Sequence, residues 1–246
     1  KALEALSEGA EHGTVISGSK ATDSQLAFLF TGQGSQISQM GHGLYTTCDA
    51  FRAELDAVWA ALDPHLERPL RDVVFAEQDS EEGAALNETA YTQPALFALE
   101  VALAKLWISW GIRPTHLMGH SIGELSAAHV AGVLDLDDAA RLVCARGRLM
   151  QACESGGAMV SLEATEQEVL EVLGQSSGVI DIAGLNGPNQ TVISGATSDV
   201  TQVADVFTGR GRKTTKLAVS HAFHSAHMDG MLDAFREVAA SCTFRT

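Results

Sequence analysis

Basic residues are scarce in this sequence of 246 residues. Its 16 Lys and Arg residues stand against 31 Asp and Glu residues, which gives a formal net charge of −15. A surface of that sign repels the phosphate backbone of nucleic acids, so the composition argues against a nucleic-acid-binding function. An anionic ligand would have to bind at a local basic spot.

Cysteine and long apolar runs are scarce as well. None of the four cysteines has Cys-x-x-Cys spacing, which predicts free thiols in a reducing cytoplasm. The most apolar long stretch, residues 95–110, is interrupted by Glu100 and Lys105, which indicates a buried helix rather than a membrane span. Residues 1–9 are polar and lack a signal-peptide pattern. We therefore expect a cytoplasmic protein that does not enter a membrane.

One motif carries a clear chemical signal. Residues 119–123 read Gly-x-Ser-x-Gly, with an apolar run at 117–118 before them and a helical pattern at 124–130 after them. A strand, a sharp turn and a helix are the context that a nucleophile elbow requires, with Ser121 exposed on the turn. The backbone N–H of Ile122 would then point at an oxyanion formed on an attacked carbonyl.

A second loop follows a predicted strand near the start of the chain. The apolar run at residues 26–30 is typical of a buried parallel strand, and Thr31-Gly32-Gln33-Gly34-Ser35-Gln36 follows it at once. A dinucleotide fingerprint would need a third glycine where Ile37 stands, so that reading is weak. A backbone donor for the same oxyanion fits the loop better.

The periodicity predicts an α/β protein with a large and a small domain. Helices are expected over residues 49–62, from Thr92-Gln93-Pro94 to Gly111, and over 135–152, with an acidic loop at 77–88. From residue 158 the order becomes βαββαβ, which is typical of a ferredoxin-like unit inserted into a larger, α/β-hydrolase-like domain with a parallel sheet. The predicted segments are a linker at 1–24, the large domain at 25–155, the small domain at 156–219 and a return segment at 220–246.

A serine hydroxyl needs a base, and nine histidines are available. His120 adjoins the serine, but neighbours on a turn diverge, which favours a structural role. His221, His224 and His227 cluster where the chain returns to the large domain. Two other interpretations stay open for this cluster: a metal site, for which no clear carboxylate or cysteine partner follows, and loop histidines without a role. No single aspartate stands out as a third triad member.

Five motifs in order resemble the acyltransferase domains of modular polyketide synthases, relatives of the malonyl-CoA:acyl-carrier-protein transacylases. The motifs are Phe30-Thr31-Gly32-Gln33-Gly34-Ser35-Gln36, Gln93-Pro94-Ala95-Leu96-Phe97, Gly119-His120-Ser121-Ile122-Gly123-Glu124, Arg146-Gly147 and His221-Ala222-Phe223-His224-Ser225. The resemblance covers about residues 27–244 and accounts for the small domain. Family members continue well past the His224 region, so we expect the C-terminal part of the large domain to be absent here.

The resemblance implies roles for individual residues. Ser121 would carry the acyl group as an ester, and His224 would be its base, oriented by a backbone carbonyl rather than by an aspartate. The N–H groups of Gln33 and Ile122 would form the oxyanion hole. Arg146 would hold a malonyl carboxylate, a task that suits its planar fork; the alternative is a surface arginine. The remaining residues expected at the substrate pocket are Gln93, Asn186, Phe223 and His120.

The substrates and partners follow from the same resemblance. They are malonyl-CoA, the phosphopantetheine thiol of an acyl carrier protein, and a neighbouring ketosynthase, with no metal or redox cofactor. Phe223 in the His-Ala-Phe-His form of the last motif resembles the malonyl-selective type. The basic run Arg210, Arg212, Lys213 and Lys216 is either a solvated strand edge or a dock for CoA phosphates or the carrier protein. Two rival functions remain: a serine esterase or thioesterase, and a non-catalytic docking domain.

Overall fold

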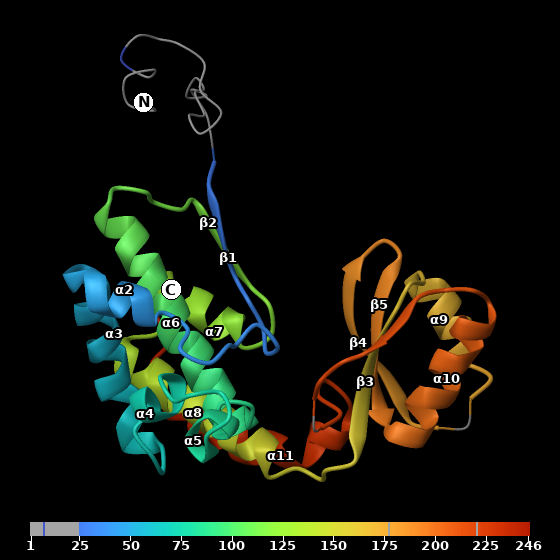
Figure 1. Cartoon of the computed structure of the whole chain (residues 1–246). Coiled ribbons are helices and arrows are strands. Elements are labelled where there is room, and N and C mark those ends of the chain that lie inside the picture. The colour runs from blue at the N-terminus through green and yellow to red at the C-terminus, as the bar shows by residue number, and fades with distance from the viewer. Residues whose placement is uncertain (1–6, 8–24, 177, 220) are drawn as a thin grey trace.

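The chain folds into two α/β units that are joined by extended segments. In this computed structural model, residues 7, 25–176, 178–219 and 221–246 are described. A helical large domain carries a small parallel sheet, and an antiparallel sheet with two helices stands beside it (Figure 1). The predicted fold class is therefore confirmed. The predicted linker at 1–24 lies outside the described residues, apart from Ser7.

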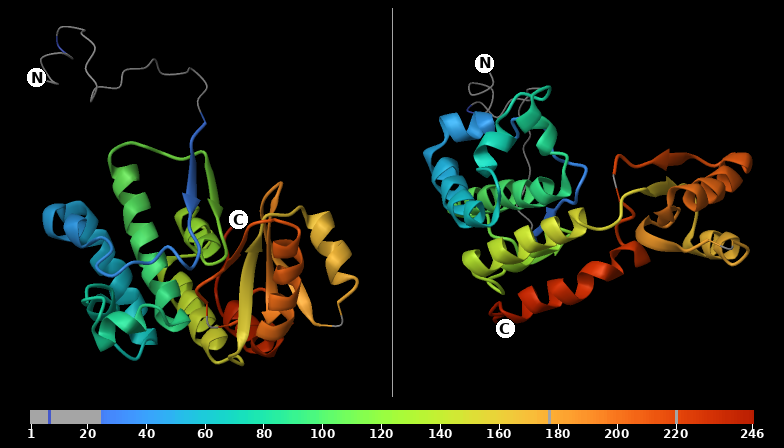
Figure 2. Two further views of the ribbon diagram at one scale, coloured as in Figure 1. Left: turned by 45° about the vertical axis from the view of Figure 1, so that its right-hand side comes forward. Right: turned by 90° about the horizontal axis from the view of Figure 1, so that it is seen from below.

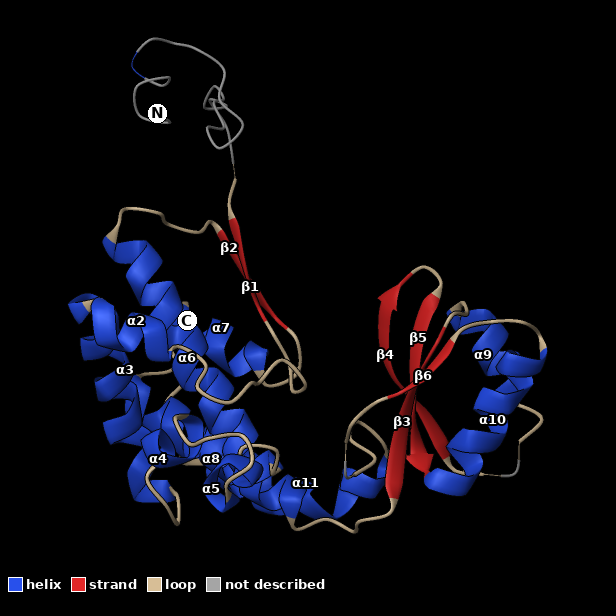
Figure 3. Cartoon of the chain, in the orientation of Figure 1, coloured by secondary structure: helices blue, strands red, loops and turns tan. Residues whose placement is uncertain are grey.

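The large domain is built mainly of helices around one apolar core. Its elements are β1 (Ala27–Phe30), α2 (His42–Thr47), α3 (Asp49–Leu62), η1 (Asp63–His65), α4 (Leu70–Val74), α5 (Glu81–Ala85), α6 (Thr89–Ser109), β2 (His116–Gly119), α7 (Gly123–Val130) and α8 (Leu136–Gln151). Helix α6 runs through the middle and packs against α3, α7 and α8, which explains why it is apolar nearly all round. Figure 3 shows how far helices dominate this domain.

Two predictions for this domain need correction. Helix α6 begins at Thr89, earlier than expected, so Pro94 lies inside the helix rather than in its first turn. The predicted acidic loop contains the short helix α5, because the Ser80 hydroxyl caps it by accepting a hydrogen bond from the N–H of Gly83. Gly111 does end α6 as predicted, with φ of 85°.

Strands β1 and β2 form the parallel sheet that carries the candidate site. They pair in register from Ala27 with His116 to Phe30 with Gly119, and both lead directly into loops of interest. One face packs on α6 and α7 through Phe30. The other face exposes Leu29 and Met118. Within the described residues this sheet has only these two strands.

The small domain is a four-stranded antiparallel sheet covered by two helices. Its elements are β3 (Gly157–Leu162), α9 (Glu166–Leu173), β4 (Ile180–Gly187), β5 (Gln190–Ala196), α10 (Thr197–Gly209) and β6 (Thr214–Lys216). The strand order β4-β5-β3-β6 is the ferredoxin-like arrangement that the βαββαβ pattern predicted. Strand β6 is shorter than the expected 213–219.

Successive side chains of β3 point to opposite faces of the small sheet, and both faces are apolar. Ala158, Val160 and Leu162 face α9 and α10 and form the core of the domain. Met159 points to the opposite face, where it joins Phe223 of the return segment. The small sheet therefore serves two purposes: one face stabilises the domain and the other is a wall toward the large domain.

The return segment brings the chain back to the large domain. Helices η2 (Ala226–Met228) and α11 (Asp229–Ala240) follow the small domain, and α11 runs back along α8 (Figure 2). Its contact with α8 fixes where the residues just before it lie, including His224. Among the described residues no helix has the length and hydrophobicity needed to cross a membrane.

Candidate active site

Ser121 lies on a turn whose backbone leaves no room for side chains at the flanking glycines. A Cβ on Gly119 would come within 2.2 Å of Gly123 backbone atoms, and one on Gly123 would lie 2.5 Å from the carbonyl oxygens of Phe30 and Thr31. Ser121 itself has φ of 55°, a left-handed conformation that costs a non-glycine residue about 1–3 kcal/mol. The close contact between the start of α7 and the end of β1 holds this strained elbow in place.

The loop after β1 packs directly on the elbow. A Cβ on Gly32 would lie 2.6 Å from the His120 ring, so the two segments are in close contact. The Gln33 side chain is held by a 2.6 Å hydrogen bond from the Thr89 hydroxyl at the start of α6. Within the described residues, the backbone N–H groups of Gln33 and Ile122 donate to no protein acceptor. Both donors are therefore available to a ligand oxygen.

His224 reaches the serine from the return segment. Its Nε2 lies 2.9 Å from Ser121 Oγ, across 103 residues of sequence. Like Ser121 it has a left-handed backbone, with φ of 57°. Neighbouring contacts hold this conformation: the Ser225 hydroxyl donates to the carbonyl of Ala222, and the N–H of Ala226 donates to an Asp181 carboxylate oxygen of β4. The small domain thus helps to position the histidine.

Arg146 of α8 contacts the same serine oxygen. Its Nη2 donates to Ser121 Oγ at 3.0 Å and its Nη1 donates to Gln93 Oε1 at 2.7 Å. The Gln93 amide then donates from Nε2 to the Met150 sulfur at 3.2 Å. Because a guanidinium can only donate, Ser121 Oγ accepts from Arg146, and its own proton can be donated to His224 Nε2 in the tautomer that leaves this nitrogen unprotonated.

Electrostatics favours a neutral histidine beside a charged arginine. Although part of the ring is open to solvent, burial lowers the pKa of His224 below its usual 6.5, and the charges of Arg146 and His120 lower it further. Burial lowers the pKa of Arg146 to about 10, so its guanidinium remains protonated at neutral pH. A hydroxyl that contacts both a neutral base and a permanently charged cation is suited to nucleophilic attack on an anionic substrate.

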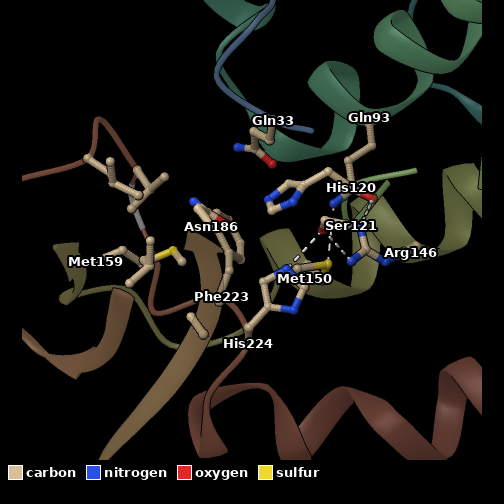
Figure 4. Close-up of a pocket in the computed structure, with 15 residues that line it drawn as sticks. Gln33, Gln93, His120, Ser121, Arg146, Met150, Met159, Asn186, Phe223 and His224 are labelled. Carbon is tan, nitrogen blue, oxygen red and sulfur yellow. Dashed lines mark hydrogen bonds between the residues drawn. The ribbon is translucent and has the colours of Figure 1, made fainter. Parts of the chain in front are cut away.

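A cavity of about 90 Å³ opens over Ser121 between the two domains (Figure 4). Eight of the nine residues predicted for the site line it: Gln33, Gln93, His120, Ser121, Arg146, Asn186, Phe223 and His224. The ninth, Ile122, has a fully buried side chain and could contribute only its backbone. Gln33 and Asn186 come from opposite walls, the loop after β1 and strand β4.

The sequence interpretation missed the apolar wall of this cavity. The missed residues are Met150, Met159, Ala183, Gly184, Val192, Leu217 and Val219. Met150 lies four residues after Arg146 on α8, so helical spacing could have placed it on the same face. The others come from the inner face of the small sheet and the segment after it. Which face is inner depends on how the two domains meet.

The three clustered histidines point to different places. His221 is buried, with Nε2 3.2 Å from the carbonyl oxygen of Cys153 and its ring stacked on Phe223. His224 contacts Ser121, and His227 follows on η2. In the part of the chain that the structure describes, no three His, Cys, Asp or Glu side chains gather as metal ligands. The arrangement does not support the metal-site interpretation.

The basic run is partly neutralised by acidic neighbours. Arg212 forms an ion pair of 2.7 Å with Glu168 of α9, which makes it a structural contact. Lys213 and Lys216 are exposed at the end of the small domain. A docking role for these lysines stays a prediction.

Comparison with known proteins matches residues 27–246 to the acyl transferase domain family. The chain belongs to this family. The match extends across the inserted small domain to the return segment, so Ser121, Arg146 and His224 all lie within it.

Sequence relatives of this acyltransferase domain are very large proteins. Polyketide synthase GfsA of Streptomyces halstedii is 51% identical over 245 residues, which is 99% of this chain and 3% of that protein. The present chain therefore corresponds to a small part of such a synthase.

Solved structures have the same fold. The acyltransferase domain from the second module of the salinomycin polyketide synthase superposes with a TM-score of 0.89 at 50% identity, over 99% of this chain and 56% of that one. The malonyl CoA-acyl carrier protein transacylase of Clostridium perfringens gives a TM-score of 0.80 at 28% identity, over 91% of this chain and 70% of that one. The chain spans little more than half of the length of the salinomycin domain.

The lowered pKa of His224 predicts how reaction at Ser121 depends on pH. The rate of labelling by an uncharged fluorophosphonate should be constant near pH 7 and fall only as the pH drops through a value below 6.5, because the base must be neutral. In Arg146→Ala the inflection should move up toward 6.5, since one charge that disfavours the imidazolium is gone. The exposed Arg148→Ala on the same helix is the control. An inflection that does not move in Arg146→Ala would contradict this account.

Proposed function

We propose that this acyltransferase domain moves a malonyl group from malonyl-CoA, through an ester on Ser121, to the phosphopantetheine thiol of an acyl carrier protein. One observation carries the proposal: Ser121 Oγ is hydrogen-bonded both to a neutral histidine and to a half-buried arginine. The base makes the oxygen a nucleophile, and the arginine places a positive charge beside the reacting atom. The fold shared with a malonyl CoA-acyl carrier protein transacylase supports the same substrate class.

The reaction would proceed in two similar halves. As Ser121 Oγ attacks the thioester carbonyl, its proton passes to His224 Nε2, and the backbone N–H groups of Gln33 and Ile122 stabilise the oxyanion. Collapse of the tetrahedral intermediate breaks the carbon–sulfur bond, and His224 returns the proton to the CoA sulfur. The carrier thiol then attacks the ester, giving its proton to His224, which donates it to Ser121 Oγ as the ester bond breaks.

Arg146 is the residue suited to select a carboxylated acyl group. Two of its five N–H groups are engaged by Gln93 and Ser121, and among the described residues no carboxylate lies within ion-pair distance of it. A partly desolvated guanidinium without an anion is an unfavourable arrangement that a substrate carboxylate would relieve. This is the physical argument for a malonyl rather than an acetyl group.

Intact mass spectrometry after incubation with malonyl-CoA tests the proposal. The chain should gain one malonyl group, and Ser121→Ala should gain none, because the only nucleophile on the elbow is removed. Circular dichroism should be the same for both, since the Ser121 side chain is not part of the core. An adduct that persists in Ser121→Ala would refute the assignment. Release of free malonate without an adduct would indicate a hydrolase, and absence of any reaction a docking domain.

Arg146→Ala is expected to affect malonyl transfer far more than acetyl transfer. A charge-assisted hydrogen-bond pair to a carboxylate contributes about 1.5–3 kcal/mol, or about 10- to 150-fold in kcat/KM. Acylation rates with malonyl-CoA and acetyl-CoA should be compared in Arg146→Ala and in the exposed control Arg148→Ala. Equal losses for both esters in Arg146→Ala would show that the arginine does not hold the carboxylate.

Phe223 is expected to discriminate against a methyl group on the malonyl carbon. Its ring is buried, lines the cavity, and packs among Met159, Val192 and Met228, so it has little room to move aside. A snug pocket rejects one methylene by about 1–3 kcal/mol. Phe223→Ser should therefore lower the preference for malonyl-CoA over methylmalonyl-CoA in a direct competition, mainly by removing the clash. An unchanged ratio of kcat/KM values would show that the ring contributes to packing only.

The relatives also suggest the partners. Since the sequence relative is a polyketide synthase, we propose that an acyl carrier protein and a ketosynthase are the domains with which this one works. Lys213 and Lys216 would be available to the phosphates of CoA or to an acidic carrier protein.

A further inference from the structure

A buried carboxylate connects the two halves of the candidate oxyanion hole. Glu100 lies in the middle of α6 and is 9% exposed. Its Oε1 accepts hydrogen bonds from the N–H of Thr31 at 2.7 Å and from the Thr31 hydroxyl at 2.8 Å. Its Oε2 accepts from the Ser126 hydroxyl at 2.7 Å. Thr31 begins the loop that carries Gln33, and Ser126 belongs to the helix that follows Ser121.

The placement of these contacts matters because each oxyanion donor comes from a different segment. Gln33 lies two residues after Thr31, and Ile122 lies four residues before Ser126, one turn of α7. The loop and the elbow already touch through Gly32 and His120. Through the carboxyl group of Glu100, helix α6 is hydrogen-bonded both to the loop after β1 and to α7. A change in its contacts would alter the distance between the two N–H groups.

The charge of Glu100 has no other evident use. Among the described residues it takes part in no ion pair, so three hydrogen bonds alone compensate for its burial. Desolvation raises the pKa of this carboxyl, and the hydrogen bonds from Ser126 and Thr31 oppose the rise. Burying a charge is costly, and an apolar residue at this position of an apolar helix would avoid that cost.

We infer that Glu100 is a positioning residue that sets the geometry of the oxyanion hole through Thr31 and Ser126. It touches neither the nucleophile nor the cavity over Ser121. The inference rests on the proposed role of Ser121 and of the Gln33 and Ile122 N–H groups, and it concerns how fast the serine reacts rather than what it binds.

The test measures the reactivity of Ser121 with an uncharged fluorophosphonate, followed by intact mass in the 246-residue chain. Glu100→Leu should slow labelling by on the order of 10- to 100-fold, as expected when an oxyanion donor is displaced. Glu100→Gln should label at close to the wild-type rate, because its amide oxygen can accept from Thr31 while its NH₂ group donates to the Ser126 hydroxyl. With malonyl-CoA, Glu100→Leu should lower kcat and leave KM nearly unchanged.

A matched control separates positioning from stability. Leu106→Ala removes a buried side chain near the C-terminal end of α6, six residues after Glu100, that forms no hydrogen bond with Thr31 or Ser126 through its side chain. It should lower the midpoint of thermal unfolding and leave the labelling rate unchanged. If Glu100→Leu does not fold, the double variant Thr31→Val, Ser126→Ala removes both hydroxyl contacts and is expected to slow labelling as well.

The outcomes distinguish this inference from the proposed function. Wild-type labelling rates in folded Glu100→Leu, or in the double variant, would overturn the positioning role. A chain that reacts with the fluorophosphonate but not with malonyl-CoA would contradict the proposed function while the role of Glu100 could still be measured. Absence of fluorophosphonate labelling in the wild-type chain would overturn both.

Discussion

The hydroxyl of Ser121 is the point at which three distant segments of the chain meet. It is hydrogen-bonded to His224, which lies 103 residues later, and to Arg146, which lies 25 residues later. Each partner is delivered by a different packing contact: α8 against α6 for the arginine, and α11 against α8 for the return segment with the histidine. A small shift of either helix would break a contact of about 3 Å. The helical core of the large domain is therefore what makes the site possible.

Backbone strain and close packing between segments occur together around Ser121 and His224. Both Ser121 and His224 have left-handed backbones, and both are held by neighbours rather than by their own preference. On the serine side the absence of side chains at Gly119 and Gly123 lets the elbow press against the end of β1. On the histidine side the carboxylate of Asp181 accepts a hydrogen bond from the N–H of Ala226, two residues after His224. The strained conformations are thus stabilised by both domains, which places the reacting groups at the boundary between them.

The positive charge of Arg146 serves two purposes at the site. Arg146 remains protonated although burial lowers its pKa to about 10, and Gln93 is the neutral side chain that orients it. Because no acidic side chain among the described residues neutralises it, the cation remains available for an external anion. The same positive charge helps to keep His224 neutral, so one residue supports both selection and reactivity.

Much of the fold followed from local patterns in the sequence. The strand, turn and helix around Ser121, the βαββαβ order of the small domain and the helix at residues 49–62 depend on turn residues and on periodicities of two and 3.6, which act over a few residues. The start of α6 and the short helix α5 were misjudged because capping by Ser80 and burial against neighbouring helices outweighed the local signals from Pro94 and the acidic residues.

Local sequence patterns predicted only part of the candidate site. The family motifs contain seven of the residues that line the cavity, and the resemblance added Asn186, but nothing near His224 in sequence states that its ring meets Ser121 rather than a metal. The wall formed by Met159 and Val192, and the link from Glu100 to Thr31 across 69 residues, were set by how the domains and helices pack. The sequence determined which short elements form and which residues can react. The tertiary structure decided which of them meet, because a hydrogen bond depends on positions within a few tenths of an ångström and only packing fixes those.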